Sequence, residues 1–290
     1  MSAERALAMV RMGRPLVLVA GLLAFFAGAC MAWWRVVELP MGTLLASLLI
    51  MVSAILMGHY ANEYADFDTD SITRRTLFSG GSGVLPSGVV PKKWALYAAI
   101  GLLLITVIGT ASAYLTGLIG LQVVALAAIG LPLGWWYSMP PLRLERTWAG
   151  EPDNALLGYM MLLMGYVPFA GMDILALAIG PPVFLIILVN LLGVHHADRE
   201  ADAMVGKRTL AVALGDRTPR VFALLVVLTY LTIIPLAMIA PGEVVLALVL
   251  TIPAGAWAVA GFMRTGGPEY GSLLMGLWFL AIGAGFLLAV

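Results

Sequence analysis

The chain has 290 residues, of which 62% are hydrophobic and 11% are charged, and its mean hydropathy is +1.00. This composition leaves too little polar surface to cover a water-soluble globule and therefore predicts a membrane protein. The formal net charge is zero, which gives no indication of a nucleic-acid partner, and the single cysteine, Cys30, excludes a disulfide framework within the chain.

The first apolar stretch follows a basic N-terminal segment, an order that superficially resembles a signal peptide. It runs from Pro15 to Trp34, which is longer than the ~7–15 residues of a signal-peptide core and close to the ~20 residues that a helix needs to cross a bilayer. We therefore expect it to be retained as the first membrane span.

Nine apolar segments are long enough to cross a bilayer and are separated by charged or Gly- and Pro-rich breaks. They lie at about residues 15–34, 41–61, 94–115, 118–138, 154–172, 174–195, 220–240, 243–263 and 270–289. Because lipid does not tolerate unpaired backbone polar groups, segments of this length are expected to be helices. The sequence thus predicts an all-α polytopic membrane protein, a nine-helix bundle that forms one domain over residues 1–290.

The positive charges fall on one side of this arrangement. With the N-terminus in the cytoplasm, 15 of the 16 basic residues lie in cytoplasmic segments and only Arg35 lies opposite. Since Lys and Arg accumulate in cytoplasmic loops, this predicts an N-in, C-out orientation. Two cytoplasmic loops are long, at about residues 62–93 and 196–219, and each opens with acidic residues.

The first acidic cluster follows the second span. Asn62, Asp66 and Asp70 recur every four residues, which places their side chains on one face if the helix continues through them. Aligned carboxylates repel each other, and a divalent cation between them would offset that repulsion. Glu63 and Asp68 point elsewhere on such a helix, and each taken alone is typical of a solvated interfacial acid.

The second cluster, HHADREAD at residues 195–202, repeats this spacing with Asp198 and Asp202. Mg²⁺ prefers oxygen ligands and binds through a few carboxylates together with substrate phosphates. Two carboxylate pairs on the second and sixth spans therefore predict a Mg²⁺ site in a cavity that faces the cytoplasm. His195 and His196 could be metal ligands, proton carriers or residues that only hydrogen-bond locally.

Basic residues follow each acidic cluster. Arg74 and Arg75 precede a Gly- and Ser-rich segment, and Lys207 and Arg208 follow the second cluster. Cationic side chains and exposed backbone N–H groups beside a metal are suited to a diphosphate. The segment YSMPPLRLER at residues 137–146 most simply ends the fourth span with a Pro break and basic anchors, and Tyr137, Ser138 and Arg143 would lie on the same cytoplasmic face as the clusters.

Together, the nine spans, the NxxxDxxxD motif of Asn62, Asp66 and Asp70, and the DxxxD motif of Asp198 and Asp202 resemble the UbiA-type intramembrane prenyltransferases over essentially the whole chain. The segment DREADAMVGKRTLAVALG, residues 198–215, is most similar to the branch that contains the 1,4-dihydroxy-2-naphthoate prenyltransferases of menaquinone synthesis. The resemblance implies transfer of a prenyl group from an isoprenoid diphosphate, through an allylic carbocation, to an aromatic or quinone-precursor acceptor.

The same resemblance implies roles for individual residues. Mg²⁺ would be held by Asp66, Asp70, Asp198 and Asp202. Substrate and departing diphosphate would be contacted by Asn62, Arg75, Tyr137, Ser138, Arg143, His195, His196 and Lys207, with Lys207 also catalytic. An apolar tunnel open to the lipid bilayer would take the prenyl tail, and the expected location is a bacterial plasma membrane. No obligate protein partner is expected.

The second motif departs from the family pattern in one position. Many members carry Asn four residues before the first acid of that motif, where this chain has Val194. We hypothesise that His195 or His196 contacts the acceptor or the proton it loses.

Two other functions remain open from the sequence. A membrane terpene cyclase would use the same ionisation of a diphosphate without an aromatic acceptor. An ion or small-molecule transporter would also place acids within a membrane protein, although it predicts acids near the middle of the bilayer, whereas these cluster at one face.

Overall fold

The computed structural model describes residues 3–36, 38–73 and 75–290, which form helices joined by loops, with no strand among them. The longer helices are α2 (Pro15–Arg35), α3 (Met41–Ala65), α5 (Lys92–Leu115), α6 (Leu121–Ser138), α7 (Gly150–Ala170), α8 (Ile174–Met204), α10 (Thr218–Leu231), α13 (Ile252–Thr265) and α14 (Glu269–Leu288). The shorter ones are α1 (Ala3–Met12), α4 (Phe67–Asp70), η1 (Leu144–Arg146), α9 (Leu210–Leu214), η2 (Gly215–Arg217), α11 (Ile233–Leu236) and α12 (Gly242–Val249).

The helical membrane architecture predicted from the sequence is confirmed. Within the described residues, eight helical stretches are long and apolar enough to cross a membrane, with Leu210–Leu236 and Gly242–Thr265 each counted as one. The predicted segment 154–172 corresponds to α7, which has 21 residues but carries Glu151 and Asp153 in its first turn and is not among the eight. The count of nine spans and the N-in orientation therefore stay predictions.

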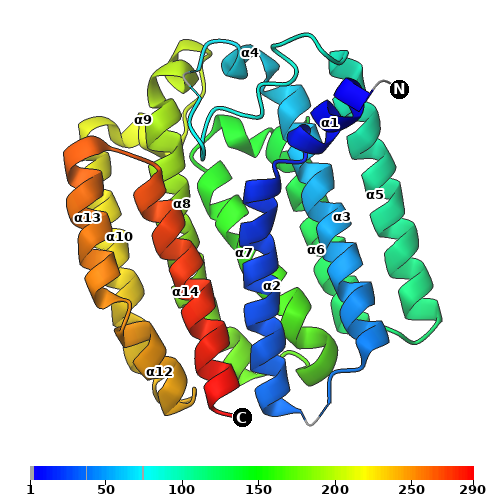
Figure 1. The fold of residues 1–290 in the computed structure, drawn as a ribbon, viewed down its shortest axis with the longest axis vertical. Helices are drawn as coiled ribbons and strands as arrows, with labels where there is room; N and C mark the ends of the chain where they lie inside the picture. The colour runs from blue at the N-terminus through cyan, green and yellow to red at the C-terminus, as the bar shows by residue number, and fades with distance from the viewer. Residues whose placement is uncertain (1–2, 37, 74) are drawn as a thin grey trace.

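The helices run roughly side by side, and several of them end together at the top of the view (Figure 1). α2 packs against α7 and α14, α3 packs against α5 and α6, and α8 packs against α7, α10 and α14. The short helices α1, α4 and α9 lie at one end of the bundle, at the top of Figure 1. Because the motif-bearing ends of α3 and α8 also lie there, we refer to this end as the acidic end.

The two motif-bearing helices are longer than the sequence predicted. α3 continues to Ala65, and α8 continues through the second motif to Met204, so the loop placed at 196–219 begins only at Val205. The segment from Asp198 to Met204 contains two Ala, one Glu, one Arg and one Met, which favour helix whether they are apolar or charged. Hydropathy marks where an apolar stretch ends, whereas helix propensity decides where the helix ends.

Two glycines allow α2 and α7 to approach closely. A Cβ atom on Gly28 would overlap the backbone carbonyl oxygen of Leu162, and one on Gly165 would overlap that of Phe25. Small residues at such crossings let helix backbones touch, which is a common mode of packing in membranes. The contact holds α2, which lines the cavity described below, against α7.

Gly165→Leu is expected to lower the free energy of unfolding by about 3 kcal/mol or more. This is at the upper end of the usual cost of overpacking, because the new side chain would clash with backbone atoms of α2, which cannot move aside as a side chain can. Thermal unfolding in detergent measures the effect. The matched control is Gly101→Ala in α5, where a Cβ meets no atom within 4 Å. Equal stability of the two variants would contradict a close α2–α7 contact.

Candidate active site

A cavity of about 980 Å³ lies between the helices and reaches the acidic end. Polar residues of both sequence motifs line it there, and apolar side chains from α2, α3, α6, α7, α8 and α14 line the rest. The cavity lining includes Asn62, Asp66 and Asp70 of the first motif and Asp198 and Asp202 of the second. It also includes Tyr137, His195 and Lys207. One cavity therefore joins a charged compartment to an apolar one.

The first motif is held by a nearly continuous helix. α3 ends at Ala65 and α4 resumes at Phe67, and the Asp70 backbone N–H donates to the Asp66 carbonyl at 2.8 Å. The Asn62 amide nitrogen lies 2.8 Å from Asp66 Oδ2 and so orients that carboxylate. Burial raises the pKa of Asp70 to about 7, against the opposing effect of the Arg14 guanidinium. A cation bound beside Asp70 would favour its ionised form.

The second motif presents its carboxylates from the last turns of α8. Asp198 Oδ2 accepts the Gly80 backbone N–H at 3.3 Å, which ties the Gly- and Ser-rich loop to this helix. Asp198 Oδ1 is buried and has no hydrogen-bond partner within the described part of the chain. Since a buried carboxylate oxygen without a partner costs free energy, it is suited to a ligand such as a cation.

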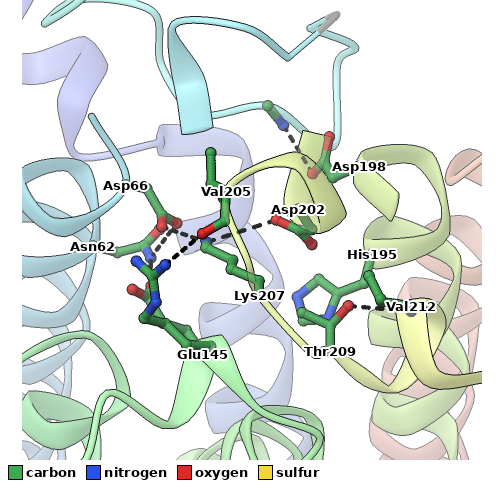
Figure 2. Close-up of polar contacts among 12 residues, drawn as sticks. Asn62, Asp66, Glu145, His195, Asp198, Asp202, Val205, Lys207, Thr209 and Val212 are labelled. Atoms are coloured by element: carbon green, nitrogen blue, oxygen red, sulfur yellow. Dashed lines mark hydrogen bonds and ion pairs between the residues drawn. The ribbon is translucent and has the colours of Figure 1, made fainter. Parts of the chain in front are cut away.

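Lys207 lies between the two motifs (Figure 2). Its Nζ contacts Asp66 Oδ1 and lies 3.7 Å from Asp202 Oδ1, and its backbone N–H donates to the Asp202 carbonyl at 2.9 Å. Burial alone would lower the pKa of Lys207, but the Asp66 and Glu145 carboxylates outweigh it and the net shift is upward. The side chain is therefore a buried, charged ammonium that joins the two acidic motifs.

Glu145 is a site residue that the sequence did not reveal. It belongs to η1, is only 4% exposed, and its Oε2 lies 2.7 Å from the Asn62 amide nitrogen and 3.2 Å from Ser138 Oγ. Burial and the nearby Asp66 raise the pKa of Glu145 to about 8. In the sequence it is one acid between Arg143 and Arg146, a pattern typical of a solvated loop, so no local signal distinguished it.

Glu63 is a buried hydrogen-bond acceptor that fixes two other segments of the chain, and it is not a solvated acid. It is buried, its Oε1 accepts from Arg14 Nε at 2.7 Å and from the Ser82 backbone N–H at 2.8 Å, and its Oε2 accepts from Ser82 Oγ. Arg14, between α1 and α2, also lines the cavity. One carboxylate thus fixes both Arg14 and the Gly- and Ser-rich loop at the mouth of the charged compartment.

Glu63→Ala is expected to release this loop, because Arg14 and Ser82 lose their shared acceptor. Hydrogen exchange at the amides of residues 80–84 should become at least about tenfold faster, which corresponds to ~1.4 kcal/mol of local stability. The control is Asp68→Ala, which removes an exposed acid from α4. Unchanged exchange in Glu63→Ala would mean that other contacts hold the loop.

The structure places four predicted residues away from the cavity wall. Arg75 is exposed and lies against Gly83, Arg143 is exposed, and His196 packs against Phe262. Ser138 is buried, and its Oγ lies 3.2 Å from the amide nitrogen of Asn62, so it contacts a residue of the cavity wall without lining the cavity itself. Arg75 and Arg143 belong to loops, whose path residue spacing alone does not determine, whereas His196 lies on α8 and Ser138 ends α6. Arg74 lies outside the described residues.

The donor set fits a divalent cation shared with a phosphorylated ligand. Within the described ranges, no three His, Cys, Asp or Glu side chains converge closely enough to hold a metal by themselves. The two motifs instead face each other across Lys207, and Asp198 offers a buried oxygen without a partner. This arrangement is suited to Mg²⁺, which takes few protein carboxylates and completes its shell with phosphate oxygens and water.

Comparison with known proteins agrees with this geometry. The model of the UbiA prenyltransferase family matches residues 21–279. The chain belongs to the UbiA prenyltransferase family. Members of this family are prenyltransferases, so the chain is an integral membrane prenyltransferase, and the prediction made from the two acidic motifs is confirmed at this level.

Two named proteins are similar to the chain. The bacteriochlorophyll synthase 33 kDa chain of Cereibacter sphaeroides is 31% identical over 169 residues, which cover 55% of this chain and 50% of that protein. The 1,4-dihydroxy-2-naphthoate octaprenyltransferase of Bacillus subtilis is 24% identical over 259 residues, which cover 87% of this chain and 80% of that protein. The chain therefore matches about half the length of the first relative and most of the second.

Solved structures share the fold. A UbiA homolog from Archaeoglobus fulgidus bound to DMAPP and Mg²⁺ superposes with a TM-score of 0.75 at 16% identity, covering 97% of this chain and 99% of that one. A digeranylgeranylglyceryl phosphate synthase gives a TM-score of 0.67 at 16% identity, with 98% and 99% covered. At this identity the likeness establishes the common UbiA fold.

Proposed function

We propose that the protein catalyses Mg²⁺-dependent transfer of a prenyl group from an isoprenoid diphosphate to an aromatic, dihydroxynaphthoate-like acceptor. The observation that carries the proposal is the single cavity, which joins carboxylates and cations at one end to an apolar chamber. An isoprenoid diphosphate has the same division, with a charged head and an apolar tail. The structures of a UbiA homolog from Archaeoglobus fulgidus bound to DMAPP and Mg²⁺ and to GPP and Mg²⁺ have this fold.

The charged compartment would hold the diphosphate through metal and ammonium charge. Asp66 and Asp70 on one side and Asp198 and Asp202 on the other would hold Mg²⁺, which supplies positive charge to the departing diphosphate oxygens. Lys207 is already placed between them. Positive charge aimed at developing negative charge in a site that excludes water is usually the largest catalytic contribution.

The apolar compartment would hold the prenyl chain. Its wall includes Ile50, Met51, Leu126, Met160, Ile187 and Phe279, all buried or largely buried. The cavity lining also contains exposed leucines and valines of α2 and α14, such as Val17 and Leu280, on the outer surface of the bundle. An opening between these helices would let a membrane-dissolved tail enter from the lipid. The expected location is a bacterial plasma membrane, with the acidic end in the cytoplasm.

The test is turnover of a purified, detergent-solubilised chain with a series of isoprenoid diphosphates, with Mg²⁺ or chelator, and with or without hydroxylated aromatic acceptors. Prenylated acceptor and diphosphate that both require Mg²⁺ support the proposal. A cyclised hydrocarbon formed equally without acceptor would indicate the terpene-cyclase function. Ion flux in proteoliposomes with no diphosphate release would indicate a transporter.

A further inference from the structure

His195 and Glu151 form a buried pair on the wall of the cavity. His195 lines the cavity from α8, and its Nδ1 lies 2.8 Å from Oε1 of Glu151, a residue of α7 with no exposed surface. The same Oε1 accepts the Leu210 backbone N–H at 2.7 Å. An ionised carboxylate only accepts hydrogen bonds, so Nδ1 carries the proton of the neutral ring and Nε2 is left as a proton acceptor.

The position of His195 suits the reacting end of a bound substrate. It precedes Asp198 by three residues on α8, which corresponds to about 4.5 Å along the helix away from the acidic end and toward the apolar compartment. The reacting carbon of a prenyl diphosphate is bonded to the diphosphate and must lie just past the metal-binding carboxylates. In Figure 2 the His195 ring leaves α8 on the side of Lys207.

We infer that His195 is the base that removes a hydroxyl proton from the aromatic acceptor, and that Glu151 is the residue that positions it. This inference rests on the proposed function. The Glu151 carboxylate lies against Nδ1, and the carboxylates of Asp198 and Asp202 also act on the ring. Mg²⁺ would neutralise Asp198 and Asp202, so Glu151 is the group that favours the imidazolium that forms when Nε2 takes a proton. A carboxylate bound to Nδ1 also keeps the ring in the required tautomer and orientation.

The step balances in protons and electrons. The O–H bond of a ring hydroxyl breaks, its proton goes to Nε2, and its electron pair is delocalised into the ring. A ring carbon forms a C–C bond to the prenyl carbon, whose C–O bond breaks with the electron pair left on the diphosphate. The displaced ring proton moves to the oxygen and restores aromaticity, so one proton remains on His195 and returns to solvent.

His196 shows that the neighbouring histidine has a different environment. Its ring meets the Phe262 ring edge-on at a centroid distance of 5.3 Å and lies against Gly266, outside the cavity lining. The sequence offered either histidine for contact with the acceptor, and the side-chain directions favour His195. His196→Gln is therefore a matched control for His195→Gln.

The test compares His195→Gln, His196→Gln and wild type in product formation with hydroxylated aromatic acceptors of graded hydroxyl acidity. We expect His195→Gln to lose about 10²-fold in kcat with a weakly acidic acceptor, the usual contribution of a general base. The loss should shrink toward unity with the most acidic acceptor, which is already ionised in solution. His195→Gln should keep the wild-type unfolding midpoint and the wild-type affinity for a prenyl thiolodiphosphate, an analogue whose C–S bond does not break. His196→Gln should match wild type in all of these measurements.

Several outcomes would overturn the inference. A loss in His195→Gln that is the same for every acceptor, or that accompanies weaker analogue binding or a lower unfolding midpoint, would indicate that the pair only holds α7 to α8 and to the start of α9. No loss with any acceptor would exclude His195 as the base. Wild type that forms no product with any acceptor would overturn the inference together with the proposed function. Glu151→Gln gives an independent check, since it should lower kcat by about tenfold with the same dependence on acceptor acidity.

Discussion

Asp66→Asn and Asp198→Asn are each expected to reduce Mg²⁺-dependent diphosphate release by about 10²- to 10³-fold, the scale on which enzymes lose rate when a group that stabilises transition-state charge is removed. Asparagine has nearly the same shape as aspartate but no charge, so it cannot hold a divalent cation in the same way. Asp66 stands beside Lys207 and Asn62, and Asp198 has a buried oxygen free for a ligand. The two substitutions therefore test the two motifs separately.

The measurement is single-turnover release of diphosphate at several Mg²⁺ concentrations. The control is Asp216→Asn, because Asp216 is a fully exposed acid that contacts only Arg199, at 3.5 Å, among the described ion pairs. We expect the control to match wild type. If Asp198→Asn retained its rate while Asp66→Asn lost it, the first motif alone would hold the metal, and the role proposed for α8 would be wrong.

The convergence of the two motifs could be predicted because each lies on a helix. Residues four apart share a helix face, and α3 with α4 keeps Asn62, Asp66 and Asp70 nearly in one helical path. The charge pattern placed both motifs on the same side of the bundle, and the structure brings them to one cavity with Lys207 between them. Whether these residues bind metal and substrate stays a prediction for the experiments above.

The remaining site residues could not be found in this way, because they reach the site through tertiary packing. Glu145, Arg14 and Glu151 come from three separate segments, and no repeat or spacing links them to the motifs. Arg75 illustrates the reverse case, since its loop folds so that the guanidinium lies against Gly83 instead of the cavity. A loop's composition indicates what it could bind, whereas its backbone path decides where each side chain lies.

Lys207→Met is expected to destabilise the metal-free protein by about 3–5 kcal/mol, the cost of removing one partner from a buried ion pair. Lys207 is 5% exposed, and Asp66 and Asp202 would then face each other without a compensating charge. Thermal unfolding in the presence of chelator measures the loss. The control is Arg208→Met, which removes the neighbouring basic side chain from an exposed position and should change stability little.

Mg²⁺ should stabilise Lys207→Met more than it stabilises wild type, because a ligand that binds only the folded state raises the free energy of unfolding by an amount that grows with the logarithm of its affinity. In the variant, Lys207 no longer competes with the cation for Asp66 and Asp202, so the affinity for the cation rises. An equal Mg²⁺ effect on both proteins would mean that the metal and the ammonium do not share these carboxylates. Diphosphate release should stay about 10²-fold below wild type even at saturating Mg²⁺, because the charge that Lys207 adds beside the leaving group is still missing. Restored stability without restored turnover would thus separate the structural role of Lys207 from its catalytic one.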